Sequence, residues 1–253
     1  MPSRLIGVAA RSAAEPGLGR LLARLDEVAP GVERLVVEGL TVAQARNAQV
    51  AHAVTGGAEV LVLVDADQLP AQADWLDRLV RPVESGEADV VSGPVVPVRA
   101  DHPAARWLAA LERGLFREIP TDPSLALNCN AAFRVAALAA LPATAAAGRG
   151  PFDESLARGG EDWDLDERLL QSGARFRFEP SAVVLHDYSA VRWPVALRKR
   201  YRYCVGGALA RLRNGTFAAS APGALARTAA HPLELPVKAT ALARAALLHY
   251  CGR

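Results

Sequence analysis

The sequence predicts an α/β fold, with a mixed and mostly parallel sheet flanked by helices. Short apolar runs rich in β-branched residues alternate with helical patterns over the first 65 residues, in the order β-α-β-α-β. That order is typical of parallel strands joined by crossover helices. The chain has 253 residues, of which 51% are hydrophobic, so it is long and apolar enough to bury the core of one large α/β domain.

The first 83 residues contain three predicted strands and three predicted helices. Apolar residues recur every three or four positions between Leu18 and Val28, which is a helical stripe. Thr41 is a suitable N-cap for the second helix, and Gly57 closes it. The strands are expected at 5–9, 35–37 and 60–64, and the helices at 18–28, 41–54 and 73–83.

The chain after residue 83 contains four further predicted strands and ends in helices. Small residues fill 144–150, which predicts a flexible loop. From about residue 190 the pattern is helical, so we expect a domain over 1–190 and a basic helical extension over 191–253 that packs on the domain or on a membrane surface. The remaining strands are expected at 88–92, 128–133, 175–179 and 180–185, and the remaining helices at 104–118 and 164–171.

Charge is distributed unevenly along the chain. Residues 186–253 hold eleven Lys or Arg and two acidic residues, a net charge of +9, whereas 1–185 hold 18 basic and 25 acidic residues, a net charge of −7. A basic segment on an acidic body indicates an anionic partner such as a phosphate or a membrane surface, or a set of solvated helix faces. Stacking residues are few in this segment, which argues against nucleic-acid binding.

Cysteine usage and hydropathy indicate the compartment. Cys129, Cys204 and Cys251 are far apart and odd in number, so neither a disulfide framework nor a zinc site follows from them. The N-terminus lacks a charged-then-apolar leader, and no run of about 18 apolar residues is present. We expect a cytoplasmic protein, with peripheral contact at the inner membrane face as the alternative.

Asp65-Ala-Asp67 is the first candidate site. It follows the apolar run 59–64, which is predicted to be a buried strand. Ligands of open α/β sheets bind at the carboxyl ends of strands, where these two carboxylates emerge. They can converge on one hard divalent cation such as Mg²⁺ or Mn²⁺, which takes oxygen ligands and bridges phosphates. The alternative is a solvated turn, because Asp is common in such loops.

Gly159-Gly160-Glu161-Asp162 is the second candidate site. The glycines allow a sharp turn or a close approach to a ligand, and the two acids lie just before the predicted helix at 164–171. Helix capping explains one or two acids at such a position but not the whole cluster. A general base needs one ionised carboxylate within reach of a hydroxyl, and Glu161 or Asp162 can supply it.

His186 ends the apolar run 182–185 and precedes Asp187. A neutral imidazole at a strand end can be a metal ligand. A hydrogen-bonded residue at the sheet edge is the alternative.

These motifs, taken in order, resemble the family-2 glycosyltransferases of the GT-A fold. The resemblance covers roughly residues 5–210, and its specificity lies in the ordered set and its spacing rather than in any one motif. The motifs that carry it are Ala45-Arg-Asn-Ala48, Asp65-Ala-Asp67, Asn130-Ala-Ala-Phe-Arg134, Phe152-Asp-Glu154, Gly160-Glu-Asp162 and Val184-Leu-His186.

The resemblance implies inverting transfer from a nucleotide-activated sugar, usually a UDP-sugar, with Mn²⁺ or Mg²⁺. It implies that Asp67 binds the metal and that Asp65 lies near the ribose and the metal. Asp162 would be the catalytic base, with Glu161 supporting it or touching the acceptor. His186 would be a further metal or phosphate contact. The resemblance also places two side chains at the donor: Arg46, and Asn130 near the sugar or the acceptor.

Two departures from the family pattern affect the expected donor site. The first strand leads to Ala9-Ala-Arg11 rather than to Pro-Thr, and the second ends at Glu38, where the family usually has an Asp that contacts the nucleobase. We expect Glu38 to replace that Asp. The segment 198–203 is similar to the basic-aromatic segment that covers the diphosphate in the family, which makes Arg200 and Arg202 candidate contacts, or else residues of a solvated face.

Two other functions are compatible with the residues. A nucleotidyltransferase acting on a sugar phosphate would use similar acids, although the basic glycine-rich N-terminal loop that suits it is missing. A non-catalytic nucleotide-sugar-binding protein of the same fold is the other. The acceptor, whether glycan, small molecule or lipid-linked, stays open.

Overall fold

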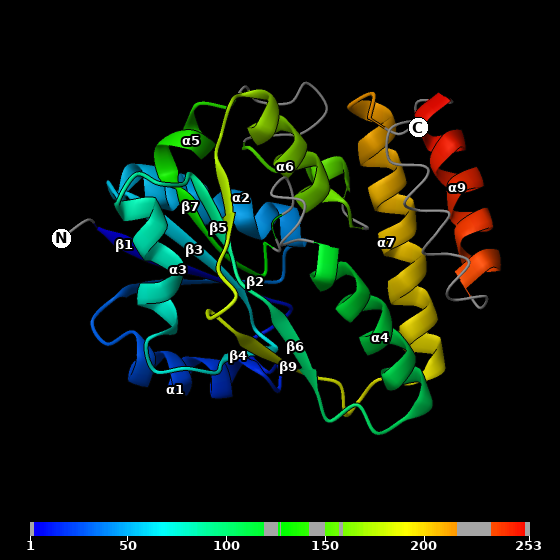
Figure 1. Ribbon diagram of the computed structural model, residues 1–253, viewed down its shortest axis with the longest axis horizontal. Coiled ribbons are helices and arrows are strands. Elements are labelled where there is room, and N and C mark those ends of the chain that lie inside the picture. Colours follow the sequence, from blue (N-terminus) through cyan, green and yellow to red (C-terminus); the bar gives the residue numbers. More distant parts are fainter. Residues whose placement is uncertain are drawn as a thin grey trace.

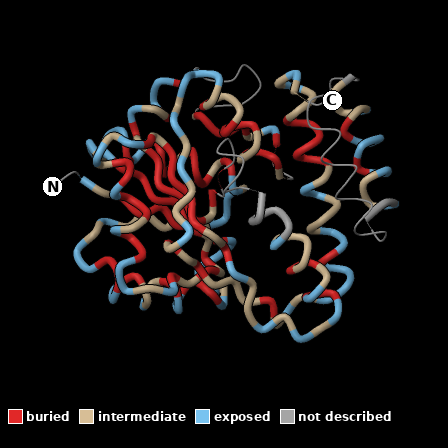
Figure 2. The backbone as a smooth tube through the Cα atoms, viewed as in Figure 1, coloured by how far each residue is buried: buried red, intermediate tan, exposed pale blue. Residues whose placement is uncertain are grey.

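A computed structural model of the protein describes residues 3–118, 126, 128–141, 150–156, 159–216 and 234–250. A six-stranded sheet forms its centre, with helices on both faces, and two long helices stand to one side (Figure 1). Figure 2 shows that the inner strands of this sheet are continuously buried, whereas its two edge strands are not. The α/β prediction with a mixed sheet flanked by helices is therefore confirmed.

The main sheet has the strand order β2-β1-β3-β7-β5-β8. β1 lies parallel to β2 and β3, β5 lies parallel to β8, and β7 runs antiparallel between β3 and β5. The first three strands therefore end at the same edge, with Ala10 opposite Glu38 and Ala9 opposite Asp65. The strands are β1 (Arg4–Ala10), β2 (Glu33–Glu38), β3 (Val60–Asp65), β5 (Val90–Ser92), β7 (Asn130–Arg134) and β8 (Phe176–Phe178).

Two apolar cores sandwich this sheet because its strands are apolar on both faces. One core packs α1 (Leu18–Val28) and α3 (Trp75–Glu84) against even-numbered residues of β3, such as Val62. The other packs α2 (Val42–Thr55), α5 (Val135–Ala139) and α6 (Glu161–Gln171) against the odd-numbered residues, such as Leu63. This alternation is the two-residue period of a strand covered on both sides.

A small three-stranded sheet lies beyond the end of β3. Its order is β4-β9-β6, with β9 (Val184–Asp187) antiparallel to β4 (Gln68–Pro70) and parallel to β6 (Val95–Val98). Gln68 pairs with His186 across the β4–β9 ladder. The small sheet therefore holds the residue after Asp67 directly against His186.

Three further helices lie beside the sheets. α4 (Pro103–Glu118) and α7 (Trp193–Arg213) lie side by side, and α9 (Glu234–Tyr250) packs along α7 (Figure 1). α7 also contacts the start of α6 so closely that a methyl group on Gly160 would lie 2.3 Å from the carbonyl carbon of Gly206. The glycine pair 159–160 thus serves contact between helices. Among the described helices, none combines the length and the apolar character needed to cross a bilayer.

Most predicted elements are present, and their bounds differ in instructive places. α6 begins at Glu161 rather than at 164, because Gly160 has a positive φ of 96° and turns the chain straight into the helix. Glu161 and Asp162 are therefore its first two residues, where the helix dipole stabilises carboxylates. β4, β6, α5 and the 3₁₀ turn Glu154–Leu156 were not predicted. The predicted loop at 144–150 falls outside the described residues except for Gly150.

Candidate active site

The carboxyl ends of β2 and β3 carry the first group of acids. Asp65 is the last residue of β3, and Glu38 is the exposed last residue of β2. The turn after Asp65 is packed tightly, because a methyl group on Gly17 would lie 2.4 Å from the carbonyl oxygen of Ala66. The loop after β1 therefore closes over the Asp65–Asp67 turn and fixes its backbone.

Arg46 joins two acids from distant parts of the sequence. This α2 residue is only 4% exposed. Its Nη2 lies 3.5 Å from Oδ1 of Asp65, and its Nη1 lies 3.4 Å from Oε1 of Glu161. The guanidinium also lies 5.6 Å from the ring centroid of Phe152. Burial alone would lower the pKa of Arg46, but the charges of Asp65, Glu161 and Asp162 act together against burial, and the pKa is raised.

Asn47, the next residue, ties α2 to the Phe152–Glu154 segment. Its Nδ2 donates to the carbonyl oxygen of Phe152 and to Oε1 of Glu154, both at 2.9 Å. Its Oδ1 accepts from the backbone N–H of Phe152 at 2.9 Å. The motif at 45–48 and the motif at 152–154 therefore form one unit, which holds the Phe152 ring beneath Arg46.

Glu161 and Asp162 face the same edge from the start of α6. Burial, together with the neighbouring charge of Asp162, raises the pKa of Glu161 to about 7, against the opposing effect of Arg46. Asp162 is half-buried, and its Oδ1 accepts from the backbone N–H of Trp163 at 3.0 Å. Asp162 is thus the more accessible carboxylate, and Glu161 is held by Arg46.

Asp67 and His186 form a pair on the more open side. Oδ2 of Asp67 lies 3.2 Å from Nε2 of His186, and the two side chains are 45% and 13% exposed. Burial would raise the pKa of Asp67, but the hydrogen bond and charge of His186, together with Lys199 and Arg11, lower it overall. Burial and the charge of Asp67 raise the pKa of Asp65, which Arg46 opposes. The two acids of the turn therefore differ in environment.

The acids suit a cation that arrives with its ligand. Within the described residues, no three His, Cys, Asp or Glu side chains gather closely enough to hold a metal unaided. Mg²⁺ in phosphate-binding sites typically uses one or two carboxylates and takes its other ligands from substrate phosphates and water. Asp65 and Asp67 provide two such carboxylates, two positions apart, where β3 ends and the chain turns. The donor set therefore fits a divalent cation bound together with a diphosphate.

The structure gives Asn130 a scaffold role. Its side chain is fully buried, with Oδ1 accepting from Nε1 of Trp75 at 3.0 Å. Its Nδ2 donates to the carbonyl oxygens of Ala182 at 2.8 Å and Pro94 at 3.2 Å. These bonds use both ends of the amide and tie β7 to the segments that precede β6 and β9. The predicted contact of Asn130 with the donor stays a prediction.

The remaining predicted contacts lie on α7, and one important neighbour was not predicted. Arg200 is half-buried and Arg202 is exposed, and each takes part in at least one interaction. Lys199, also on α7, acts to lower the pKa of Asp67 and opposes the rise in the pKa of Asp65. The sequence signal for Lys199 was its position in the basic-aromatic segment, one residue before Arg200. The sequence alone does not show which face of this helix lies toward the acids.

Cys129 lies within the site but is not a nucleophile. Burial raises the pKa of its thiol to about 12, and the charge of Asp65 adds to this effect. A thiol with so high a pKa stays protonated at neutral pH.

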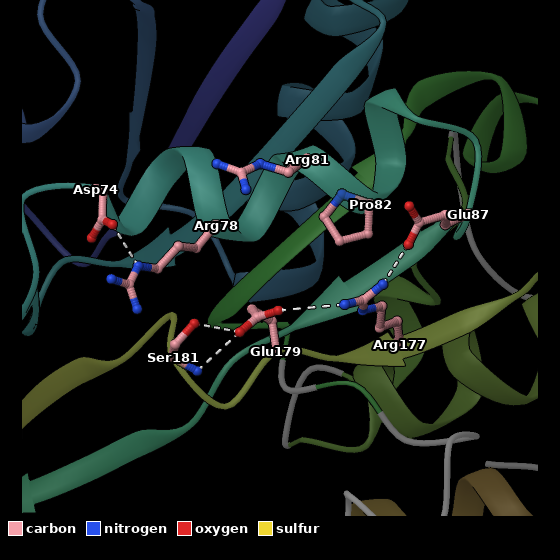
Figure 3. Close-up of a pocket in the computed structure, with 8 residues that line it drawn as sticks. All are labelled: Asp74, Arg78, Arg81, Pro82, Glu87, Arg177, Glu179 and Ser181. Carbon is pink, nitrogen blue, oxygen red and sulfur yellow. Dashed lines mark hydrogen bonds and ion pairs between the residues drawn. The ribbon is translucent and has the colours of Figure 1, made fainter.

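A hollow of about 340 Å³ lies elsewhere, between α3 and the end of β8 (Figure 3). Its charges pair with one another: Arg78 lies 2.7 Å from Asp74, and Arg177 lies 2.5 Å from Glu87. It contains none of the residues predicted for the site.

Comparison with known proteins decides the family. The family model described as "Glycosyl transferase family group 2" matches residues 60–251, which is more than half of the chain. The chain belongs to glycosyl transferase family group 2. The matched range includes Asp65, Asp67, Glu161, Asp162 and His186.

Individual relatives agree with this membership. Two Mycobacterium tuberculosis proteins, from strains CDC 1551 and H37Rv and each named pre-mycofactocin glycosyltransferase, are 32% identical over 150 residues. That match covers 58% of this chain and 30% of the relative, so the chain spans less than a third of the curated relatives it matches.

Solved structures confirm the fold. A mannosyltransferase from Pyrobaculum calidifontis, in complex with GDP-Man and Mn²⁺, matches 100% of this chain and 88% of its own with a TM-score of 0.61 at 17% identity. GalNAc-T7, with UDP, GalNAc and Mn²⁺, matches 83% of this chain and 47% of its own with a TM-score of 0.52 at 14% identity. The predicted GT-A-type fold is therefore confirmed.

Proposed function

We propose that the protein is a metal-dependent, inverting glycosyltransferase that moves a sugar from a nucleoside diphosphate to an acceptor hydroxyl. The observation that carries this proposal is the joint position of two acidic groups. Asp65 ends β3 and Asp67 lies in the turn that follows. Glu161 and Asp162 begin α6, and Arg46 lies 3.5 Å from Asp65 and 3.4 Å from Glu161. The group at 65 and 67 can bind a diphosphate together with its cation, and the group at 161 and 162 can supply a general base.

The metal would be held by Asp65 and Asp67, with His186 beside Asp67. A divalent cation at this position supplies Lewis-acid stabilisation of the negative charge on a departing diphosphate. This choice of residues is supported by the carboxylate chemistry of the turn, and by the Mn²⁺ present in both structural relatives, each of which also contains a nucleotide.

Asp162 acts as the base. It takes the proton of the acceptor hydroxyl as the oxygen attacks the anomeric carbon, on the face opposite the departing diphosphate. One base and one displacement invert the anomeric centre, whereas retaining glycosidases use a second carboxylate as a covalent nucleophile. Glu161 stays fixed by Arg46 and shapes the field around Asp162.

The proposal also covers the nucleobase of the donor, the catalytic domain and the C-terminal extension. Glu38 lies two strands from Asp65 at the same edge and is assigned to the nucleobase, with a UDP-sugar as the first donor to test. Residues 1–190 form the catalytic domain. Residues 191–253 form the extension, for which Arg200 and Arg202 are assigned to the donor, and contact with a membrane surface is the alternative role.

The test measures thermal stability with a panel of nucleoside diphosphates and nucleotide sugars, each with and without Mn²⁺. A ligand at about 100 times its dissociation constant stabilises the folded state by about 2.7 kcal/mol, which is readily visible. We expect one nucleotide to raise Tm in a metal-dependent manner. Asp67→Ala should lose this shift, whereas Asp162→Asn should keep the shift and lose transfer.

Three outcomes contradict the proposal. Transfer retained by both variants removes the assigned roles. Pyrophosphate release from a nucleoside triphosphate and a sugar phosphate would identify a nucleotidyltransferase. Nucleotide-sugar binding without any turnover, over a broad panel of acceptors, would identify a binding protein.

A further inference from the structure

The end of α7 is bonded to two elements that carry candidate site residues. Nη1 of Arg213 donates to Oδ2 of Asp153 at 2.7 Å and to Oγ of Ser155 at 2.8 Å. Nδ2 of Asn214, the C-cap of α7, donates to Oδ1 of Asp164 on α6 at 3.0 Å. Asp153 is 3% exposed and Asp164 is 4% exposed, and buried carboxylates need partners of this kind. The end of α7 is therefore bonded both to the segment before α6 and to α6 itself.

The same end of α7 covers the residue next to the proposed base. Cζ of Arg211 lies 4.2 Å from the ring centroid of Trp163, which directly follows Asp162 in the chain. The backbone N–H of Trp163 donates to Oδ1 of Asp162 at 3.0 Å, so Trp163 orients that carboxylate. A guanidinium group over an indole ring is a favourable contact, and indole is the strongest of the aromatic partners. Arg211 thus acts on the neighbour whose backbone holds Asp162.

Packing leaves the start of α6 little freedom to move relative to α7. Trp163 packs against an apolar cluster that contains Ala208 and Leu209 of α7. A methyl group on Gly206 would overlap the carbonyl oxygen of Gly159, so the two backbones are in direct contact just before α6 begins. Neither side of a contact between two backbones can yield by changing a side-chain rotamer. The position of α7 therefore determines the position of the first turn of α6.

These contacts form a second connection between two elements that Arg46 already joins. Arg46 lies 3.4 Å from Glu161 of α6 and 5.6 Å from the ring centroid of Phe152. The end of α7 holds Asp153 and Asp164, which lie one residue after Phe152 and three residues after Glu161. The segment before α6 and the first turn of α6 are thus joined once through Arg46 and once through α7. Two independent connections fix the relative position of two elements more closely than one.

We propose that Arg211 and Asn214 are positioning residues that hold Asp162 where it takes the proton of the acceptor hydroxyl. This inference rests on the proposed function and deepens it, because it gives the segment after residue 190 a part in catalysis. Both residues act through α6, Arg211 by way of Trp163 and Asn214 by way of Asp164. A general base must lie within hydrogen-bond reach of the proton that it takes, so a small displacement of α6 lowers the rate of transfer rather than the affinity for the donor.

The experiment measures turnover and donor binding separately, using the full chain with Mn²⁺. Release of nucleoside diphosphate from UDP-glucose, UDP-N-acetylgalactosamine and GDP-mannose gives kcat and KM, with water and with a panel of sugars and lipid-linked sugars as acceptors. Calorimetry with UDP and GDP measures the donor site alone. The variants are Arg211→Gln, Arg211→Lys and Asn214→Ala.

Stability controls accompany these measurements. Arg244→Gln is the matched control, because it removes an exposed cation from α9, the helix that packs along α7. Circular dichroism and Tm of each ligand-free variant establish that it is folded. Nδ2 of Asn214 also donates to the carbonyl oxygen of Ala210 at 3.0 Å, so Asn214→Ala weakens the end of α7 as well. The two Arg211 variants keep this cap and test the proposal even if Asn214→Ala unfolds.

We expect Arg211→Gln and Asn214→Ala to lower kcat roughly tenfold or more, because misplacing a reacting group by about 1 Å is enough for a loss of that size. The KM for the donor and the affinity for nucleoside diphosphate should stay near the wild-type values. Arg211→Lys should recover most of the lost kcat, since an ammonium group also binds the face of an indole ring. Arg244→Gln should match the wild type.

Two results overturn the inference while leaving the proposed function in place. In the first, folded Arg211→Gln has the kcat of the wild type. In the second, kcat and nucleotide affinity fall together in every Arg211 variant, Arg211→Lys included, which indicates a structural role only. A wild-type protein that releases no nucleoside diphosphate from any of the donors, with any acceptor, would instead remove the proposed function, and the inference with it.

Discussion

The two sides of the active site differ in how completely the protein satisfies their charges. On the buried side, Arg46 is 4% exposed and Glu161 is 8% exposed, and the guanidinium of Arg46 reaches both Glu161 and Asp65. On the open side, the side chain of Asp67 is 45% exposed and pairs with a histidine that carries charge only when protonated. One side is closed within the protein, and the other faces solvent.

This difference indicates a division of tasks. Buried charges need partners within the protein, because an unpaired buried charge costs several kcal/mol. The buried side is therefore a fixed frame that sets the distance between β3 and α6, which carries the proposed base Asp162. The open side keeps a carboxylate available to solvent, where a cation and a diphosphate can add their charges. Substitutions on the buried side should therefore change stability more than ligand binding, and substitutions on the open side should change ligand binding more than stability.

Arg46→Met should have the largest effect on stability. It leaves the buried Glu161 and the partly exposed Asp65 without their shared cation, and breaking a buried pair costs about 3–5 kcal/mol. Transfer should fall as well, since α6 loses its tie to β3. Chemical denaturation in urea measures the free energy of unfolding, and a transfer assay on the folded fraction measures the activity.

Arg78→Met is the matched control for that loss. Arg78 lies 2.7 Å from Asp74 at the start of α3, and the two side chains are 37% and 54% exposed. Pairs of this exposed kind contribute little to stability, because solvent screens their charges. If both variants lose similar stability, the buried side is not the frame described here.

Glu161→Gln should have the next largest effect, and this effect should depend on pH. The pKa of Glu161 is raised from 4.5 to about 7, so the folded state binds more protons than the unfolded state between those values. Stability attributable to this group is therefore complete below pH 4.5 and declines as pH rises to 7. The decline is about 3 kcal/mol, because each unit of pKa shift corresponds to about 1.4 kcal/mol.

The glutamine variant removes that decline because its amide does not titrate. Its free energy of unfolding, relative to the wild type, should rise steadily between pH 4.5 and 7 and level off above. A difference between the two proteins that stays constant over this interval would show that Glu161 is ionised in the folded protein throughout.

Local sequence patterns were sufficient to predict the main helices and strands of the fold. The stripe from Leu18 to Val28 gave the observed bounds of α1, and Thr41 is the observed N-cap of α2, with its hydroxyl accepting from the backbone N–H of Gln44 at 3.3 Å. The acids at 65, 67, 161 and 162 were found because they follow strands or begin a helix. Elements of three or four residues, such as β4 and β6, are too short to show a period.

Non-local contacts explain what could not be predicted. The bridge through Arg46 joins residues 19 and 115 positions away, and nothing in either neighbourhood indicates it. Lys199 obtains its partners from α4 and from the end of β9, and the role of Asn130 depends on Trp75, Pro94 and Ala182. Such roles depend on packing in three dimensions. A sequence motif gives only the position of a residue along the chain and does not show which residues it contacts.

His186→Gln should have the smallest effect on stability and a clear effect on binding. Its partner Asp67 is half-exposed, so losing the contact at 3.2 Å should change the free energy of unfolding by about 1 kcal/mol or less. The expected loss is in metal-dependent nucleotide affinity, roughly tenfold or more, as is usual for residues that orient or join a metal site. Titration of UDP and GDP with and without Mn²⁺ measures this loss.

His52→Gln provides the comparison for His186, because the two histidines have the same kind of partner in different places. Nε2 of His52 lies 2.7 Å from Oε1 of Glu33, far from the acids of the site, with side chains 43% and 62% exposed. Both variants should unfold at nearly the same denaturant concentration as the wild type, and only His186→Gln should lose Mn²⁺-dependent binding. If His186→Gln instead destabilises the chain as much as Arg46→Met does, then Asp67 belongs to the fixed frame, and the division between a buried and an open side does not hold.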